Sequence, residues 1–198
     1  MVSQRRAPGR AVRHDTEHTI GLVAPYLRDG DAVLDIGCGP AHVTAGIAAR
    51  GHDAWGVDIV DVRESELASF ALYDGTTLDF PARRFDVVLL AFVLHHVPNE
   101  LKPVLIGEAC RVCRRVVLIV EDTPRNAIDR LFSHRHGVRY RKKIGSTAAF
   151  GFYSQSEWEA LFAREQLAVV ESRALSRLCR DWKQPFARSF FAVAPCPP

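Results

Sequence analysis

The 198-residue sequence has no long hydrophobic run, no cysteine framework and no large excess of charge. No apolar stretch approaches the roughly 20 residues of a membrane span, and the N-terminus lacks the apolar core of a signal peptide. The five cysteines, an odd number, are scattered along the chain, which favours reduced thiols over a disulfide scaffold. A net charge of +3 is too small to predict nucleic-acid binding by itself. We therefore expect a cytoplasmic protein without a membrane segment.

Internal repeats and low-complexity tracts are also missing, and the length of 198 residues predicts a single domain over residues 1–198. Residues 1–13 carry four arginines around Pro8-Gly9 and are expected to form a flexible basic arm. Cys110 and Cys113 form the one cysteine pair with metal or redox spacing, but no second pair accompanies them. They lie where a helical pattern runs into a strand, so we interpret them as structural thiols and predict no metal site.

What the sequence does contain is an alternation of apolar strands and amphipathic helices, which is typical of a parallel α/β sheet. The expected strands are residues 32–36, 54–57, 70–73, 86–91, 115–120, 167–170 and 190–193. The expected helices are residues 14–27, 43–48, 101–112 and 154–162. Residues 61–68 have room for a turn or two of helix at most, so the second crossover is predicted to be short.

Residues 33–44, Val-Leu-Asp-Ile-Gly-Cys-Gly-Pro-Ala-His-Val-Thr, join a buried strand to a helix through a glycine turn. Such a turn directs backbone N–H groups toward a ligand. A dinucleotide site would have a third glycine where His42 stands, and the carboxylate of Asp35 would repel a pyrophosphate. A nucleoside that carries an amino acid, with cationic groups and no phosphate, fits this turn better.

Acidic residues also follow the next two predicted strands. Asp58 ends the second strand about twenty residues after the first glycines, where a strand–helix–strand unit places an acid beside a ribose. Asp74-Gly75 follows the third strand. Ligands of α/β sheets bind outside the carboxyl ends of the strands, where these acids fall.

Four segments together resemble class I S-adenosylmethionine-dependent methyltransferases. Val33–Gly39 resembles the first motif of that family, Gly56–Asp58 the acid that holds the ribose hydroxyls, and Asp74-Gly75 the pair that receives the adenine amino group. Residues 85–97, Phe-Asp-Val-Val-Leu-Leu-Ala-Phe-Val-Leu-His-His-Val, resemble the fourth-strand motif of its small-molecule branch. The resemblance implies a Rossmann-like, doubly wound, seven-stranded and mostly parallel sheet, with an antiparallel strand near the C-terminus.

The resemblance also implies a site for S-adenosylmethionine and its product S-adenosylhomocysteine. The residues expected to bind this cofactor are Asp35, Gly37, Cys38, Gly39, Asp58, Ile59, Asp74, Gly75, Ala91 and Phe92. The acids have a second interpretation, because aspartate also caps turns and helices. The chain departs from many members at Ala41, where they have glycine.

Methyl transfer depends mainly on alignment and desolvation, and it needs a base only if the acceptor must lose a proton. The candidates for such a role are His95, His96 and Glu121, with Asp122 beside it, all beyond the ends of the fourth and fifth strands. The alternative is that the histidines pack at the start of a helix and that the two acids cap one.

Residues 123–153 are predicted to be an insertion that covers the substrate. The segment is rich in arginine, lysine and aromatic residues, which suits an anionic or aromatic small-molecule acceptor, although solvated charges explain its composition equally well. Two other functions stay open: an RNA or protein methyltransferase that uses this basic segment, and a cofactor-binding subunit without catalysis. The oligomeric state also stays open.

Overall fold

The computed structural model describes residues 10–127, 129–131, 138, 151–175 and 187–195. Their centre is a seven-stranded sheet in the order β3-β2-β1-β4-β5-β7-β6. The strands are β1 Ala32–Ile36, β2 Asp53–Asp58, β3 Ser69–Leu72, β4 Phe85–Ala91, β5 Cys113–Asp122, β6 Ala168–Ala174 and β7 Arg188–Ala194. Strand β7 runs antiparallel to both neighbours, and the pairs among β1 to β5 are parallel. The predicted mostly parallel, Rossmann-like sheet is confirmed.

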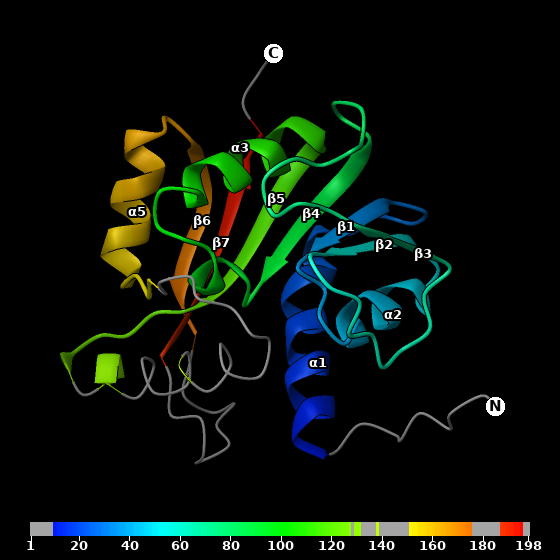
Figure 1. Cartoon of the computed structure of the whole chain (residues 1–198), viewed down its shortest axis with the longest axis horizontal. Helices are drawn as coiled ribbons and strands as arrows, with labels where there is room; N and C mark the ends of the chain where they lie inside the picture. The colour runs from blue at the N-terminus through cyan, green and yellow to red at the C-terminus, as the bar shows by residue number, and fades with distance from the viewer. Residues whose placement is uncertain (1–9, 128, 132–137, 139–150, 176–186, 196–198) are drawn as a thin grey trace.

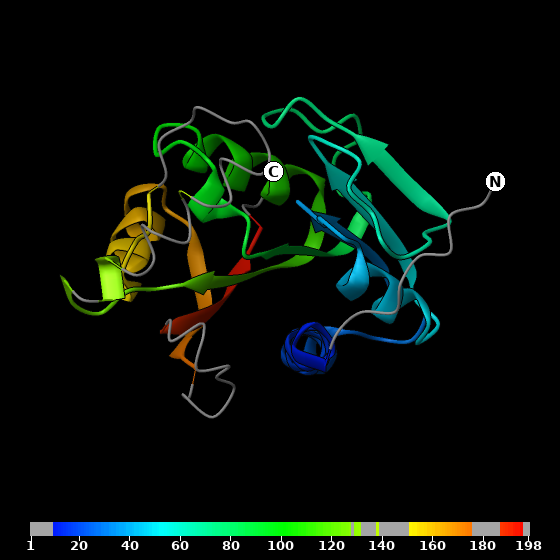
Figure 2. The ribbon, with the colours of Figure 1, turned by 60° about the horizontal axis from the view of Figure 1, so that its bottom comes forward.

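Helices cover both faces of this sheet (Figures 1 and 2). Helices α1 and α2 lie on one face, and α3 and α5 lie on the other. The helices are α1 Arg10–Val23, α2 His42–Ala48, α3 Lys102–Val112 and α5 Gln155–Arg164, with short 3-10 turns η1 Ala24–Tyr26 and η2 Leu94–His96. No helix within the described ranges is long and apolar enough to cross a membrane.

The structure corrects the predicted bounds at the N-terminus. Helix α1 begins at Arg10, so residues 10–13, which were assigned to the flexible arm, belong to the helix. Residues 1–9 lie outside the described part of the chain. The helix ends at Val23, and a 3-10 turn follows because Pro25 has no N–H to continue the helical hydrogen bonds.

The second crossover, residues 59–68, contains no helix at all. This segment lies against the glycine turn, because the N–H groups of Glu64 and Ser65 both donate to the Pro40 carbonyl, at 3.0 and 3.1 Å.

Two apolar cores lie on opposite faces of the sheet, and successive residues of β4 alternate between them. Val88 and Leu90 pack with α3 and α5, whereas Val87 and Leu89 pack with α1 and α2. Burial on both faces explains why this strand is a continuous apolar run rather than an alternating one.

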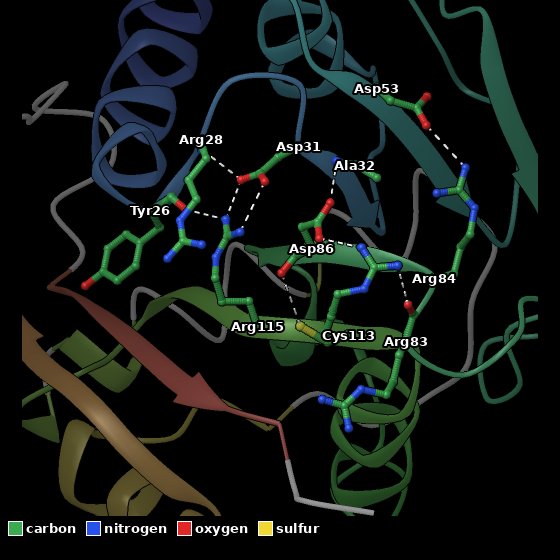
Figure 3. Close-up of polar contacts among 11 residues, drawn as sticks. Tyr26, Arg28, Asp31, Ala32, Asp53, Arg83, Arg84, Asp86, Cys113 and Arg115 are labelled. Carbon is green, nitrogen blue, oxygen red and sulfur yellow. Dashed lines mark hydrogen bonds and ion pairs between the residues drawn. The ribbon is translucent and has the colours of Figure 1, made fainter.

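The amino-terminal edge of the sheet is held by polar contacts (Figure 3). Arg115, on β5, pairs with the buried Asp31 and donates to the Tyr26 carbonyl at 2.8 Å. Asp86, on β4, accepts the N–H of Ala32 at 3.0 Å. These contacts join the starts of three strands, so they stabilise the end of the sheet opposite to the strand carboxyl ends.

Ala41 adopts a left-handed backbone conformation, with a φ of 64°, and its side chain is buried. A non-glycine residue in this region pays about 1–2 kcal/mol, while glycine costs about 0.4–1 kcal/mol through the unfolded chain. We therefore expect Ala41→Gly to raise the free energy of unfolding by about 0.5–1 kcal/mol in urea denaturation. Ala45→Gly, inside the regular helix α2, is the control and should lower it by about 1 kcal/mol. Equal destabilisation by both variants would contradict the strain at Ala41.

Candidate functional site

A cavity of about 540 Å³ lies at the carboxyl ends of the parallel strands. Its volume is in the range of small-molecule sites. All ten residues predicted to bind the cofactor line it, together with parts of α1, α2 and the segment after β4. The structure thus brings together residues that span positions 35 to 92.

The glycine turn is docked onto the end of β2. The N–H groups of Gly37 and Cys38 both donate to the Val57 carbonyl, at 2.8 and 3.1 Å. Gly37 has a φ of 72°, and a Cβ atom added there would lie 2.2 Å from Val93 Cγ2. Glycine is therefore required here both by the backbone conformation and by the close approach of the segment after β4.

Asp58, at the end of β2, organises the backbone around it. One carboxylate oxygen accepts the N–H of Gly39 at 2.8 Å, and the other accepts that of Ile59 at 2.7 Å. The capping role that the sequence left open is thus present. The Val60 N–H also donates to Asp58, at 3.4 Å. A carboxylate has about four acceptor sites, so Asp58 can still accept a hydrogen bond from a ligand hydroxyl group.

Asp35 is a buried carboxyl group that lines the cavity. Thr44 Oγ1 donates to its Oδ2 at 2.5 Å. Burial, with a further contribution from the negative charge of Asp58, raises the pKa of Asp35 to about 7. The described residues that line the cavity include no lysine or arginine. A cationic group on a ligand would therefore act as the ion-pair partner of the ionised Asp35 carboxylate.

Asp74 lies in the turn after β3, and its side chain is exposed. Its Oδ1 accepts the N–H groups of Thr77 and Thr76, each at 2.7 Å, and the Thr76 hydroxyl at 2.9 Å. The bond from Thr77, followed by those from Thr76, lowers the pKa of Asp74. The turn-capping alternative is therefore realised, and it fixes this acid at the rim of the cavity.

The three candidate bases are not brought together at the cavity. His96 lines it, whereas His95 and Glu121 are buried behind it. His95 Nδ1 lies 2.6 Å from Glu121 Oε2, and Glu121 Oε1 accepts the Leu94 N–H at 2.7 Å. Burial lowers the pKa of His95, but the charge of Glu121, its hydrogen bond to the ring and the charge of Asp122 together outweigh burial and leave the pKa raised. His95 and Glu121 thus pair with each other and hold the η2 turn, and His96 is the candidate base that lines the cavity.

The sequence did not indicate the contribution of α1. Asp15, Thr16 and Thr19 of this helix also line the cavity. The available signal was their spacing, because positions i and i+4 lie on the same helix face. That spacing alone does not tell a site from a solvated surface.

The insertion predicted at residues 123–153 is described only at its ends. At the start, the Thr123 N–H donates to the Ala187 carbonyl at 2.7 Å. At the end, the buried Lys102 Nζ donates to the Gly151 carbonyl at 2.5 Å. The Phe152 ring stacks on the His95 ring, with 4.7 Å between the two ring centres. Burial lowers the pKa of Lys102 to about 8. Most of the basic cluster of this segment lies outside the described residues.

Comparison with known proteins agrees with this geometry. Residues 6–172 match a family described as a methyltransferase domain. An uncharacterized methyltransferase of Bacillus licheniformis is 33% identical over 82 residues, which cover 38% of this chain and 38% of that protein. The chain thus spans well under half the length of this curated relative.

Two solved structures share the fold at low sequence identity. Magnesium protoporphyrin IX methyltransferase from Synechocystis, with bound S-adenosylhomocysteine, has a TM-score of 0.66 and 14% identity, over 94% of this chain and 84% of that one. Geranyl diphosphate C-methyltransferase from Streptomyces coelicolor has a TM-score of 0.67 and 12% identity, over 91% and 79% of the two chains.

The family match covers most of the chain, and the two solved methyltransferases share its fold. The chain therefore belongs to the methyltransferase domain family and has the S-adenosylmethionine-dependent class I methyltransferase fold.

Proposed function

We propose that this protein transfers a methyl group from S-adenosylmethionine to a small-molecule acceptor. The observation that carries the proposal is one cavity lined by Asp35, Asp58 and Asp74, which lie at or near the carboxyl ends of three adjacent strands. Asp58 would accept the ribose hydroxyls, Asp74 the adenine amino group, and Asp35 the ammonium group of the methionine part. Donors of hydrogen bonds and a net positive charge suit this set of carboxylates.

S-adenosylmethionine, when bound, supplies a methyl group that is already activated for displacement. The protein's part is to hold the two reactants in line and to exclude water. Ala91, Phe92 and Val93 line the cavity where β4 ends, between the acids and the segment that bears His96. His96 is the candidate base for an acceptor that must lose a proton, and an acceptor that is already nucleophilic would not need it.

A small acceptor is favoured over a macromolecule by two considerations. The two solved neighbours described above are named for acting on a porphyrin and on a prenyl diphosphate. The sequence of the 123–153 insertion is basic and aromatic, which suits an anionic or aromatic acceptor. RNA, protein and the absence of any acceptor are the alternatives that an assay must separate.

Donor binding is tested by replacing Asp58. We expect Asp58→Ala to weaken binding of S-adenosylhomocysteine about 100-fold, because hydrogen bonds to a charged group contribute about 1.5–3 kcal/mol each. Isothermal titration calorimetry measures the change. Asp61→Ala is the control, since Asp61 forms an exposed ion pair with Arg63 in the same loop. Wild-type protein without saturable binding, or equal binding by Asp58→Ala, would contradict the site.

The acceptor class is tested separately. Wild-type protein and Asp58→Ala are incubated with isotopically labelled S-adenosylmethionine and with small-molecule, RNA and protein fractions, and mass spectrometry locates the label. The proposal expects label in a small molecule with wild-type protein alone. Label in RNA or protein would support one of the alternative acceptors. If no fraction carries label, the protein would be a non-catalytic, cofactor-binding subunit.

A further inference from the structure

Arg188, the first residue of β7, connects three elements beside the cavity. It lies opposite Asp122 in the antiparallel pair of β7 with β5, at the end where β5 finishes. Its Nε donates to Asp122 Oδ1 and its Nη1 to Asp15 Oδ1, each at 3.2 Å. Its guanidinium carbon lies 4.6 Å from the centre of the Phe92 ring. One side chain thus joins helix α1 to the ends of β4 and β5.

Burial and the contact with Asp122 hold the Arg188 side chain in place. Its side chain is only 14% exposed, and that of Asp122 only 7%. Burial raises the pKa of Asp122, and the charge of Arg188 opposes that effect. An arginine fork can bond two carboxylates at fixed angles, which a single ammonium group cannot do. The contact with Asp122 therefore fixes the direction of the guanidinium group.

The two other partners of Arg188 face the cavity. Asp15 and Phe92 line it, whereas Arg188 and Asp122 are not among the lining residues. Phe92 has a φ of 56°, a conformation that costs a non-glycine residue about 1–2 kcal/mol. Its ring therefore needs support from its surroundings to keep this position. The contact with Arg188 provides that support.

The positions of Asp15 and Phe92 relative to the sheet indicate which part of a ligand these residues face. Asp58 and Asp74, the acids proposed to hold the nucleoside, follow β2 and β3. Phe92 and Asp122 follow or end β4 and β5, across β1 from those two strands (Figure 1). The end of the cavity at Asp15 and Phe92 is thus left for the methionine part of the donor and for the acceptor.

We propose that Arg188 is a positioning residue, which fixes Asp15 and Phe92 as the cavity wall that faces the methionine part of the donor and the acceptor. The inference rests on the proposed orientation of the donor. It requires that loss of Arg188 affects ligands with a methionine part and spares the nucleoside alone. A general loosening of the fold would weaken both.

The test compares S-adenosylhomocysteine with adenosine, which lacks the amino-acid part. Calorimetry measures the first and ligand-detected NMR the second, for wild-type protein, Arg188→Met and Arg188→Lys. We expect both variants to bind S-adenosylhomocysteine at least tenfold more weakly and adenosine within twofold of wild type. Arg188→Lys keeps a positive charge beside Asp122, so it tests the geometry even if Arg188→Met does not fold.

Arg115→Met is the matched control. Arg115 also pairs with a buried aspartate, Asp31, but at the opposite edge of the sheet (Figure 3). The Arg115→Met variant should have a lower unfolding temperature than wild type, and its dissociation constants for S-adenosylhomocysteine and adenosine should be unchanged.

A double-mutant cycle distinguishes the proposed route from other effects. Asp15→Asn combined with Arg188→Lys should weaken S-adenosylhomocysteine binding no more than the stronger single change, because both changes remove the same contact. Additive losses, equal losses for both ligands, or no loss in Arg188→Lys would overturn the inference while leaving the proposed function intact. Wild-type protein that binds neither ligand would overturn the proposed function, and the inference with it.

Discussion

Asp35→Asn is expected to weaken donor binding about 100-fold and to make the ligand-free protein more stable. The pKa of Asp35 is raised from 3.8 to about 7 by burial, so the folded state disfavours its ionised form. For a carboxyl group with a raised pKa, stability is highest below the unfolded pKa and falls as the pH rises to the folded one. Asparagine carries no charge, and its Oδ1 can still accept the Thr44 hydroxyl.

The stability effect has a defined pH dependence. Each pKa unit corresponds to about 1.4 kcal/mol, which sets an upper bound of about 4 kcal/mol. Urea denaturation at pH 8 should show Asp35→Asn more stable than wild type by about 2–4 kcal/mol. The difference should shrink toward zero near pH 4. A variant no more stable than wild type at pH 8 would show that the buried carboxyl group imposes no cost.

The binding effect has the opposite sign. Asp35 must lose its proton to accept an ammonium group as an ion pair, so the affinity of wild-type protein for S-adenosylmethionine should rise from pH 5.5 to pH 8. Asp35→Asn should bind about 100-fold more weakly and show no such rise. Asp53→Asn is the control, because Asp53 pairs with Arg84 at the amino-terminal edge of the sheet. Equal binding by Asp35→Asn and wild type would remove Asp35 from the site.

Gly37→Ala is expected to cause the second large loss. The added Cβ would lie 2.2 Å from Val93 Cγ2 and 2.8 Å from Val93 Cβ. Rotation of the valine side chain moves only the first of these atoms, so the backbone after β4 must shift. The left-handed conformation adds about 1–2 kcal/mol and the overpacking about 1–3 kcal/mol. We expect the free energy of unfolding to fall by about 2–5 kcal/mol, with loss of S-adenosylhomocysteine binding.

Two variants isolate the cause of this loss. Gly39→Ala has a positive φ of 51°, but among the described residues no atom other than those of its chain neighbours lies within 4 Å of the added Cβ, so it should cost only about 1–2 kcal/mol of stability. Val93→Ala, combined with Gly37→Ala, removes the nearest methyl group and should restore part of the lost stability. If Gly37→Ala and Gly39→Ala had the same free energy of unfolding, the close approach to Val93 would not contribute to the loss of stability.

The sequence by itself determined the fold and the outline of the cavity, because both depend on signals within short segments. The apolar run at residues 86–91 predicted the strand β4. A helix was expected from residue 154, and α5 follows a capping box there, in which the Ser154 N–H donates to Glu157 Oε2 at 2.7 Å. The glycine turn and the acids after the strands needed only the rule that parallel strands end at one edge.

Tertiary packing alone decided which of the candidate bases reaches that cavity and which distant residues support its wall. Glu121 and His95 had the right chain positions, but burial turns them toward each other and leaves His96 at the wall. Arg188 and Asp15 are 173 residues apart in the chain, and no local pattern relates two residues at that separation. Periodicity and spacing report on neighbours along the chain. The contacts between α1, β5 and β7 depend on how distant segments pack.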